Sequence, residues 1–521
     1  MDLRDLSEGQ RRFLAVLAVF GKPIPVDAAT SLVPLSSNDL TDLVGNRTQV
    51  GWLERVNDSL ALTRKLPRQV REALKESIAP DRLVELFDQI RDLDLYDRLD
   101  SKTLDRLFQG AGHSKEAAFV AYERAVQETK KGHLHAALEN QLRAVANLSD
   151  FLGDPECDSL FISAAFGVSE LWIHEMIQSE RVFDTLNQAE AICIRKGDQR
   201  HLALVHLHKG RLRHLTGNHD EAMTFFAKGT GLVNELGDED IMARSAQFFG
   251  MYSFIQGRLK EASDYFDRAM SKRVLEEGLA SIYPAVVYYA NCAVYLGQFY
   301  RAIGLMDSTR RRALLESDHR MARFLEACLG IYLLMIGKRR EGVFHLQSVE
   351  KEALERNELG SQIWSQRALA FCLFLEGRIQ ESYDKMKQCL AAASRAGIPR
   401  PFYSFPWVLE LLTEYRLKGF PPIPEYDFER EMQFALDGVN IHLRGVALRL
   451  RARHYEAMGR EPRELKALYE SSETDLKNAQ DPTELAKTRA DLALLKLRLG
   501  KKSEAMNLAL QAWEGLSIYV Y

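Results

Sequence analysis

Five glycines recur at a constant interval of forty residues, and this period constrains the fold more than any other feature of the sequence. They are Gly217, Gly257, Gly297, Gly337 and Gly377. Small residues stand five positions after and seven positions before them: Ala222, Ala262, Ala302, Gly342 and Ser382, then Gly210, Gly250, Ala290, Gly330 and Ala370. A fixed period of this length indicates a repeat architecture.

The physical reason for the pattern is the close approach of two antiparallel helices. Two helices pack tightly only where the facing positions lack bulky side chains, and larger side chains then fill the space beside the contact. Nine residues after each turn glycine stands a large apolar residue: Phe226, Phe266, Met306, Leu346 or Met386. A glycine at the turn ends the first helix by adopting a positive φ. Each unit is therefore predicted to be helix, tight turn, helix.

The same spacing extends in both directions, with turns at Gly132, Gly459 and Gly500 and weaker matches near Arg181 and Gly419. We predict roughly nine units over residues 117–521. The unit resembles the tetratricopeptide repeat, whose period is about 34 residues, and six further residues lengthen each helix by nearly one turn. The resemblance implies a right-handed superhelix, and the expected fold class is all-α.

The segment before the repeats has a different pattern. Residues 7–20, 26–33 and 36–44 show the apolar spacing of short helices, and 52–56 and 59–63 flank Asn57-Asp58 as a β-hairpin would. We expect a winged-helix-like domain over residues 1–78, a helical connector over 79–116 and the repeat superhelix over 117–521. Because the third helix carries Asp39 and Asp42, which repel phosphate, we do not expect direct binding of nucleic acid.

Three stretches carry a wider resemblance. Residues 6–21 (LSEGQRRFLAVLAVFG), 66–74 (LPRQVREAL) and 108–118 (FQGAGHSKEAA) are similar to the winged helix and the start of the repeat array in signal-transduction ATPases with numerous domains. This class contains the bacterial maltose-regulon activator. The resemblance covers nearly the whole chain and implies a sensor arm that holds a ligand or a protein.

The chain departs from this class because it lacks the GxxxxGK[ST] loop that binds nucleotide phosphates. Nucleophile-elbow, zinc-helix and dinucleotide-binding motifs are also missing, so we expect neither enzyme activity nor a cofactor. His206 and His208 are two residues apart, which on a helix points them in different directions, and no metal site is expected.

Composition indicates the environment of the protein but does not identify a partner. A net charge of -4, arising from 69 basic and 73 acidic residues, gives no strong long-range attraction to nucleic acid or membrane. The six cysteines form no CxxC pair, which favours reduced, buried thiols. With no export signal and no apolar run of membrane-spanning length, we expect a cytoplasmic protein without a membrane partner.

The repeat phase also predicts which residues of each first helix line the groove of the superhelix. We expect the partner-binding set to be Arg211, His214, Arg244, Gln247, Asn291, Tyr295, Trp364, Arg367, Arg449 and Arg453. Arginine and aromatic residues are the types that dominate binding energy at protein interfaces. Two alternatives stay open: Trp364 and Tyr295 are core residues between repeats, and the basic helix around Arg449 pairs with acidic neighbours.

Three functions fit these observations. The first is the non-catalytic sensor or scaffold of a bacterial signalling or transcription regulator, which binds a protein or small ligand in the groove. The second is a stand-alone adaptor that bridges two proteins. The third, which the acidic third helix disfavours, is a transcription factor that binds DNA through the winged helix.

Overall fold

The structure is a computed structural model. It describes residues 6–20, 22–44, 52–63, 68–78, 114–131, 133–175, 178–273, 279–397, 405–424 and 426–517, with positions 82, 85, 86, 89, 90, 92 and 93. By its internal contacts the chain divides into two compact units. Unit 1 is residues 1–128 with 135–167, and unit 2 is residues 129–134 with 168–521.

Unit 1 begins with helices that alternate with a small sheet. The elements are α1 (Glu8–Val19), β1 (Ile24–Pro25), α2 (Val26–Leu32), α3 (Ser37–Val44), β2 (Leu53–Val56), β3 (Ser59–Leu62) and α4 (Arg68–Glu76). The predicted hairpin is confirmed, because β2 pairs antiparallel with β3 and Asn57 takes a φ of 54° in the turn. The sequence pattern missed β1, a two-residue strand that pairs with the other edge of β3.

Residues of the first repeat-like helix belong to the core of unit 1. Helices α7 (Ser114–Lys130) and α8 (Leu134–Leu148) and the short 3₁₀ helix η3 (Ser149–Phe151) follow the N-terminal elements. Ala117 and Val120 of α7 pack against a cluster that includes Phe13 and Leu60. The division into units therefore does not coincide with the predicted boundaries at 78 and 116, which stay predictions. Residues 64–67 and 94–113, on which part of the resemblance rests, lie outside the described residues.

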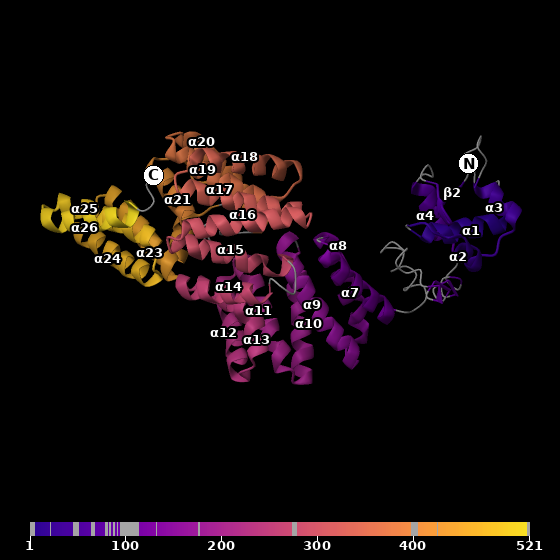
Figure 1. Cartoon of the computed structure of the whole chain (residues 1–521). Coiled ribbons are helices and arrows are strands. Elements are labelled where there is room, and N and C mark those ends of the chain that lie inside the picture. The colour runs from indigo at the N-terminus through magenta and orange to yellow at the C-terminus, as the bar shows by residue number, and fades with distance from the viewer. Residues whose placement is uncertain are drawn as a thin grey trace. The chain divides into compact units, whose positions relative to one another are not determined.

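From residue 155 onward the chain consists of helices that follow one another in pairs (Figure 1). They are α9 (Pro155–Glu175), α10 (Ser179–Lys196), α11 (Gln199–Leu215), α12 (His219–Leu236), α13 (Glu239–Ile255), α14 (Leu259–Arg273), α15 (Leu279–Tyr295), α16 (Phe299–Leu315), α17 (His319–Met335), α18 (Arg339–Glu355), α19 (Leu359–Leu375), α20 (Ile379–Arg395), α21 (Trp407–Leu417), α22 (Phe428–Asp437), α23 (Ile441–Ala457), α24 (Pro462–Ala479), α25 (Pro482–Arg498) and α26 (Lys502–Ser517). The predicted all-α array of tandem helical hairpins is confirmed.

The roles assigned to the repeating residues are confirmed in detail. The turn glycines have positive φ values, for example 75° at Gly257 and 77° at Gly377. At Gly330 in α17, a Cβ atom would lie 2.7 Å from Cγ of Leu346 in α18, so a larger residue does not fit. The irregular unit predicted near Gly419 has shorter helices, α21 and α22, with Pro421, Pro422 and Pro424 between them.

One continuous hydrophobic core runs through unit 2 from Ala203 to Ala479. All six cysteines are buried and carry free thiols, as the spacing indicated. Among the described residues, no helix combines the length and the apolar character needed to cross a membrane.

Candidate functional site

Most of the residues predicted to line the groove lie inside the protein. Seven of the ten are buried: Arg211, His214, Gln247, Asn291, Tyr295, Arg367 and Arg449. Trp364 and Arg453 are partly buried. Arg244 is exposed, and its guanidinium pairs with Asp240 one turn earlier on the same helix. Other residues of the chain therefore cover most of these ten positions, and their assignment to a groove stays a prediction.

One residue that covers these positions is Phe405, which lies just before α21. Its ring lies 5.1 Å from the Trp364 ring and 6.5 Å from the Tyr295 ring. The guanidinium carbon of Arg367 lies 4.2 Å from the centre of the Trp364 ring and 4.3 Å from that of Phe405. Arginine between two aromatic rings is stabilised by cation–π attraction, which strengthens when water is excluded. Three predicted groove residues thus meet around Phe405.

The beginning of α23 contacts the same cluster and the turn between α13 and α14. The backbone N–H of Ile441 donates to the carbonyl of Gln256, in the turn between α13 and α14, over 3.1 Å. The His442 ring lies 4.6 Å from Tyr295, and its Nε2 is 2.8 Å from a carboxylate oxygen of Asp481. Helices that are several units apart in sequence therefore touch across the interior.

Three other buried polar residues of the set, Arg211, His214 and Asn291, have partners within unit 2, whereas the amide oxygen of the buried Gln247 accepts no hydrogen bond from the residues that the structure describes. Arg211 donates to the carbonyl oxygen of Ser169 over 3.1 Å, and Asn291 accepts from the Tyr332 hydroxyl over 2.6 Å. His214 lies 3.1 Å from the Tyr288 hydroxyl, and burial lowers the pKa of His214 to about 3. His214 is therefore neutral at physiological pH, and these residues act as internal polar contacts in the closed array.

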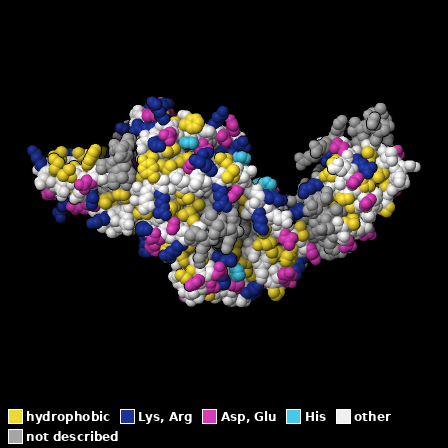
Figure 2. Space-filling view, viewed as in Figure 1, with side chains coloured by type: hydrophobic (Ala, Val, Ile, Leu, Met, Phe, Trp, Pro, Cys, Tyr) yellow, Lys and Arg dark blue, Asp and Glu magenta, His cyan; other side chains and the backbone are white. Residues whose placement is uncertain are grey.

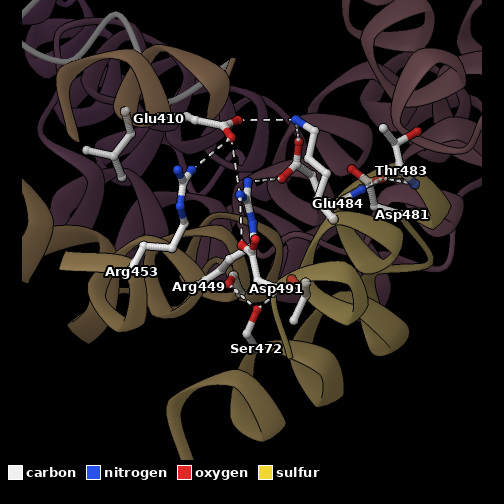
Figure 3. A network of polar contacts seen from close by, with 12 residues as sticks. Glu410, Arg449, Arg453, Ser472, Asp481, Thr483, Glu484 and Asp491 are labelled. Carbon is white, nitrogen blue, oxygen red and sulfur yellow. Dashed lines mark hydrogen bonds and ion pairs between the residues drawn. The ribbon is translucent and has the colours of Figure 1, made fainter. Parts of the chain in front are cut away.

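Arg449 is the centre of a buried ionic network that joins three helices, α21, α23 and α25 (Figure 3). Its guanidinium lies 2.7 Å from Glu484 and 3.2 Å from Glu410. Lys487 pairs with both carboxylates, at 2.7 Å and 3.2 Å. The helix around Arg449 thus pairs with acidic neighbours, the second of the two alternatives left open by the sequence.

The outer part of the network is less buried. Arg453 pairs with Glu414 over 2.5 Å, and Asp491 lies 3.7 Å from Arg449. Asp491 is surrounded mainly by protein, and burial raises the pKa of its carboxyl. The network therefore contains three cations, Arg449, Arg453 and Lys487, and four carboxylates, which leaves it without an excess of positive charge for an anionic ligand.

The network holds its inner carboxylates in the charged form. Burial by itself would raise the pKa of Glu410, but the charges of Arg449 and Lys487 outweigh burial and hold this pKa well below its ordinary value. The same two cations lower the pKa of Glu484 against the effect of burial. Removing either the carboxylates or the cations would leave an uncompensated buried charge, so the contact between these units is costly to break by substitution.

Sequence reasoning missed the residues that complete both clusters. Phe405 and Glu410 belong to the irregular unit, where the glycine spacing gives no phase for assigning a helix face. Lys487 and Asp491 lie on α25. One signal in the sequence could have indicated the network: acidic and basic residues are frequent at the inner positions of neighbouring first helices. Within the described part of the chain, no group of three or more histidine, cysteine or acidic side chains is arranged to hold a metal ion.

Comparisons with known proteins give likenesses to helical-repeat structures. No protein-family model matches the chain, and no curated protein matches it. A Rap protein complexed with competence and sporulation factor is 12% identical, with a TM-score of 0.44, over 74% of this chain and 99% of that one. The Rap conjugation gene regulator of plasmid pLS20, in complex with the Phr* peptide, is 13% identical, with a TM-score of 0.42, over 72% and 97%.

A signal-transduction ATPase with numerous domains from Pyrococcus horikoshii, which has a tetratricopeptide-repeat sensor, is 12% identical, with a TM-score of 0.28, over 99% of this chain and 64% of that one. These likenesses concern the arrangement of helices alone. The all-α array of helical repeats is seen in the chain's own helices.

Proposed function

We propose that the chain is a non-catalytic sensor or scaffold that binds a protein or peptide on the inner face of its repeat array. The observation that carries the proposal is the cluster of Trp364, Arg367 and Tyr295 around Phe405. Aromatic and arginine side chains grouped in a desolvated pocket are the residues that contribute most to protein binding. Here the chain's own phenylalanine occupies the position that a partner's apolar side chain would take.

Binding at this face requires the array to open. Some of the contacts that close it join units distant in sequence, such as Phe405 with Tyr295 and the backbone hydrogen bond from Ile441 to Gln256, whereas Phe405 meets Trp364 and Arg367 of the unit directly before its own. Stacking between adjacent units supplies most of the stability of a repeat array, so the closing contacts can separate while the hairpins stay folded. A partner that binds only the open form would shift the population toward it, which is the behaviour of a sensor.

The same proposal includes the identity of the N-terminal domain, the class of regulator and the cellular location. The elements α1 to α4 would form a winged-helix-like domain, and the protein would serve a bacterial signalling or transcription regulator in the cytoplasm without a cofactor. Asp39 on α3 accepts a hydrogen bond from Gln10. The acidic character of α3 gives no support to DNA binding, and we propose that the small domain is a scaffold.

A second candidate function is an adaptor that uses the outer face of the array without opening. Its support is the exposure of two large side chains on second helices, Tyr300 on α16 and Phe344 on α18. Exposed aromatic residues of this size are common anchors at protein interfaces. The sensor therefore places the partner on first helices of the hairpins, and the adaptor places it on second helices.

A partner-binding assay with variants of this protein distinguishes these two functions. A partner is first captured from the native host with the full chain and identified by mass spectrometry, and its affinity is then measured. For the sensor we expect Phe405→Ala to tighten binding because it removes the internal competitor. Trp364→Ala should weaken binding about thirtyfold, the effect of losing a central anchor.

Lys338→Ala, on an exposed turn, is the matched control and should leave the affinity unchanged. Circular dichroism must show that each variant keeps its helix content. If Phe405→Ala and Trp364→Ala both bind like the wild type while Tyr300→Ala weakens binding, the inner face is not the site and the adaptor function is correct.

A further inference from the structure

The contact between the beginning of α23 and the turn at Gly257 continues into the ionic network through one carboxylate. His442 is the second residue of α23, and its Nε2 lies 2.8 Å from Oδ2 of Asp481. Oδ1 of Asp481 accepts from the backbone N–H groups of Thr483 and Glu484, each over 2.9 Å. Asp481 therefore caps the N-terminus of α25 and at the same time holds the beginning of α23.

The first turn of α25 connects this cap to the network. Glu484, whose backbone N–H is bonded to Asp481, has its carboxylate 2.7 Å from the guanidinium of Arg449. Arg449 reaches Glu410 on α21 over 3.2 Å, and α21 begins two residues after Phe405. Hydrogen bonds and ion pairs therefore run without interruption from the beginning of α23 to the helix that follows Phe405, and Figure 3 shows the part from Asp481 to Glu410.

The charged groups of this chain of contacts are buried, unlike the charged groups on the surface. Figure 2 shows lysine, arginine, aspartate and glutamate side chains distributed over the visible surface, where water compensates each charge. Asp481 and Arg449 are each 1% exposed, and Glu484 is 8% exposed. Separating one pair while the others stay closed would leave a buried charge without compensation. Separating all of them admits water to every charge, so the contacts should open together.

We propose that Asp481 makes the array open as one unit, because it couples α21, which follows Phe405, to the contact of α23 with the turn at Gly257. Displacement of α21 removes Glu410 from the network and frees the first turn of α25. Asp481 moves with this turn and releases the beginning of α23. Asp481 is thus a positioning residue in an element with two arrangements, one closed and one open.

Opening exposes the inner face to a partner, and in this respect the coupling rests on the proposed function. The coupling itself is a property of the chain without a partner, so it is measured on the free protein. A partner that binds second helices instead would refute the proposed function and leave the result on the free protein unchanged. Absence of coupling in the free protein would refute the role of Asp481 and leave the partner's binding site unchanged.

Hydrogen exchange at Ile441 reports the release of α23. A substitution at Phe405 would not isolate the network, because the ring of Tyr295 lies between the rings of Phe405 and His442. Glu410→Gln instead removes a charge on α21 and keeps the shape of the side chain. We expect this variant to exchange the Ile441 N–H roughly 5- to 150-fold faster, the usual range of coupling between two sites.

Asp481→Asn is the second substitution of a double-mutant cycle. Asparagine also caps helices well, so α25 should stay folded, but its amide lacks the charge that strengthens the bond to His442. In the Asp481→Asn background, Glu410→Gln should no longer change exchange at Ile441. Additive effects of the two substitutions would mean that the sites are independent, and they overturn the proposal.

Two controls separate coupling from a general loss of stability. Glu414 lies on α21 as Glu410 does, and within the described residues it pairs with Arg453 of α23 and with no residue of α25. Glu414→Gln should therefore leave exchange at Ile441 unchanged. The N–H of Leu329 in α17 reports unfolding of the whole array. If Glu410→Gln accelerates exchange equally at Leu329 and Ile441, the network only stabilises the protein as a whole and the coupling is refuted.

Coupling between two sites is reciprocal, so it is also measurable from the other end without altering the network. Val408, in the first turn of α21, donates its N–H to the carbonyl oxygen of Phe405 over 3.0 Å. Gly257→Ala, which displaces the beginning of α23, should speed exchange at Val408. Gly377→Ala, which has no atom within 4 Å of its added Cβ, should not. Exchange at Val408 that is the same in Gly257→Ala as in the wild type overturns the proposal.

Discussion

Replacing Gly257 by alanine tests whether the array closes on itself. A Cβ atom at this position would lie 2.5 Å from the backbone nitrogen of His442 and 2.6 Å from Oδ1 of Asn440. Non-bonded atoms do not approach that closely, so the beginning of α23 would have to move away from the turn between α13 and α14. The variant should therefore weaken the contact between the turn at Gly257 and the start of α23, while the packing between the two helices of each hairpin is unchanged.

The free energy of unfolding should fall for two separate reasons. Gly257 has a φ of 75°, and an alanine in this left-handed region costs about 1–2 kcal/mol. Overpacking against the start of α23 adds about 1–3 kcal/mol. Gly377 has nearly the same φ, 77°, and no atom within 4 Å of its added Cβ. Gly377→Ala therefore carries the first cost alone, and the difference between the two variants measures the contact.

Hydrogen exchange at Ile441 is the decisive assay. This residue begins α23, so its N–H has no acceptor within the helix, and its hydrogen bond goes to the carbonyl of Gln256. Losing about 1–3 kcal/mol of closing free energy should speed its exchange roughly 5- to 150-fold in Gly257→Ala. If Gly377→Ala speeds exchange at Ile441 equally, α23 is not held by that turn and the closed inner face is wrong.

Further predictions concern the ionic network and the helix contacts. Arg449→Met should destabilise the protein by about 3–5 kcal/mol in urea denaturation, because it leaves Glu410 and Glu484 buried with less positive charge; an unchanged midpoint would contradict the network. The lowered pKa values of both carboxyls mean that their stabilisation is complete above the unfolded value of about 4.3 and is lost as pH falls through the folded values. The wild type should therefore lose more stability than Arg449→Met on acidification from about pH 5, and parallel titrations would count against this. Gly330→Ala should destabilise by about 1–3 kcal/mol, whereas Gly304→Ala, with open space around its Cβ, should stabilise by about 0.5–1 kcal/mol in thermal unfolding; the same sign for both would refute the close contact of α17 and α18.

Local rules made the hairpins predictable. A turn glycine, a small residue on each helix and a large apolar residue beside them act within about twenty residues, so the forty-residue spacing alone assigns Gly330 and Leu346 to one contact. The β2–β3 hairpin was predictable for the same reason, because alternation and the Asn57-Asp58 turn are properties of a dozen neighbouring residues. The strand β1 escaped because two residues carry too little pattern.

The contacts between distant units were decided by tertiary structure. Whether the inner face stays open depends on the curvature of the array, which accumulates from small rotations between units that no single position encodes. The forty-residue spacing placed Tyr295 and Arg367 on that face but could not show Phe405 and His442 arriving to cover it. The charge of Arg449 was visible in the sequence, yet its partners come from α21 and α25, and only the packing of three helices brings Glu410 and Glu484 to its guanidinium. Short-range packing follows from the residue pattern, whereas long-range closure follows from the summed geometry of all the units between.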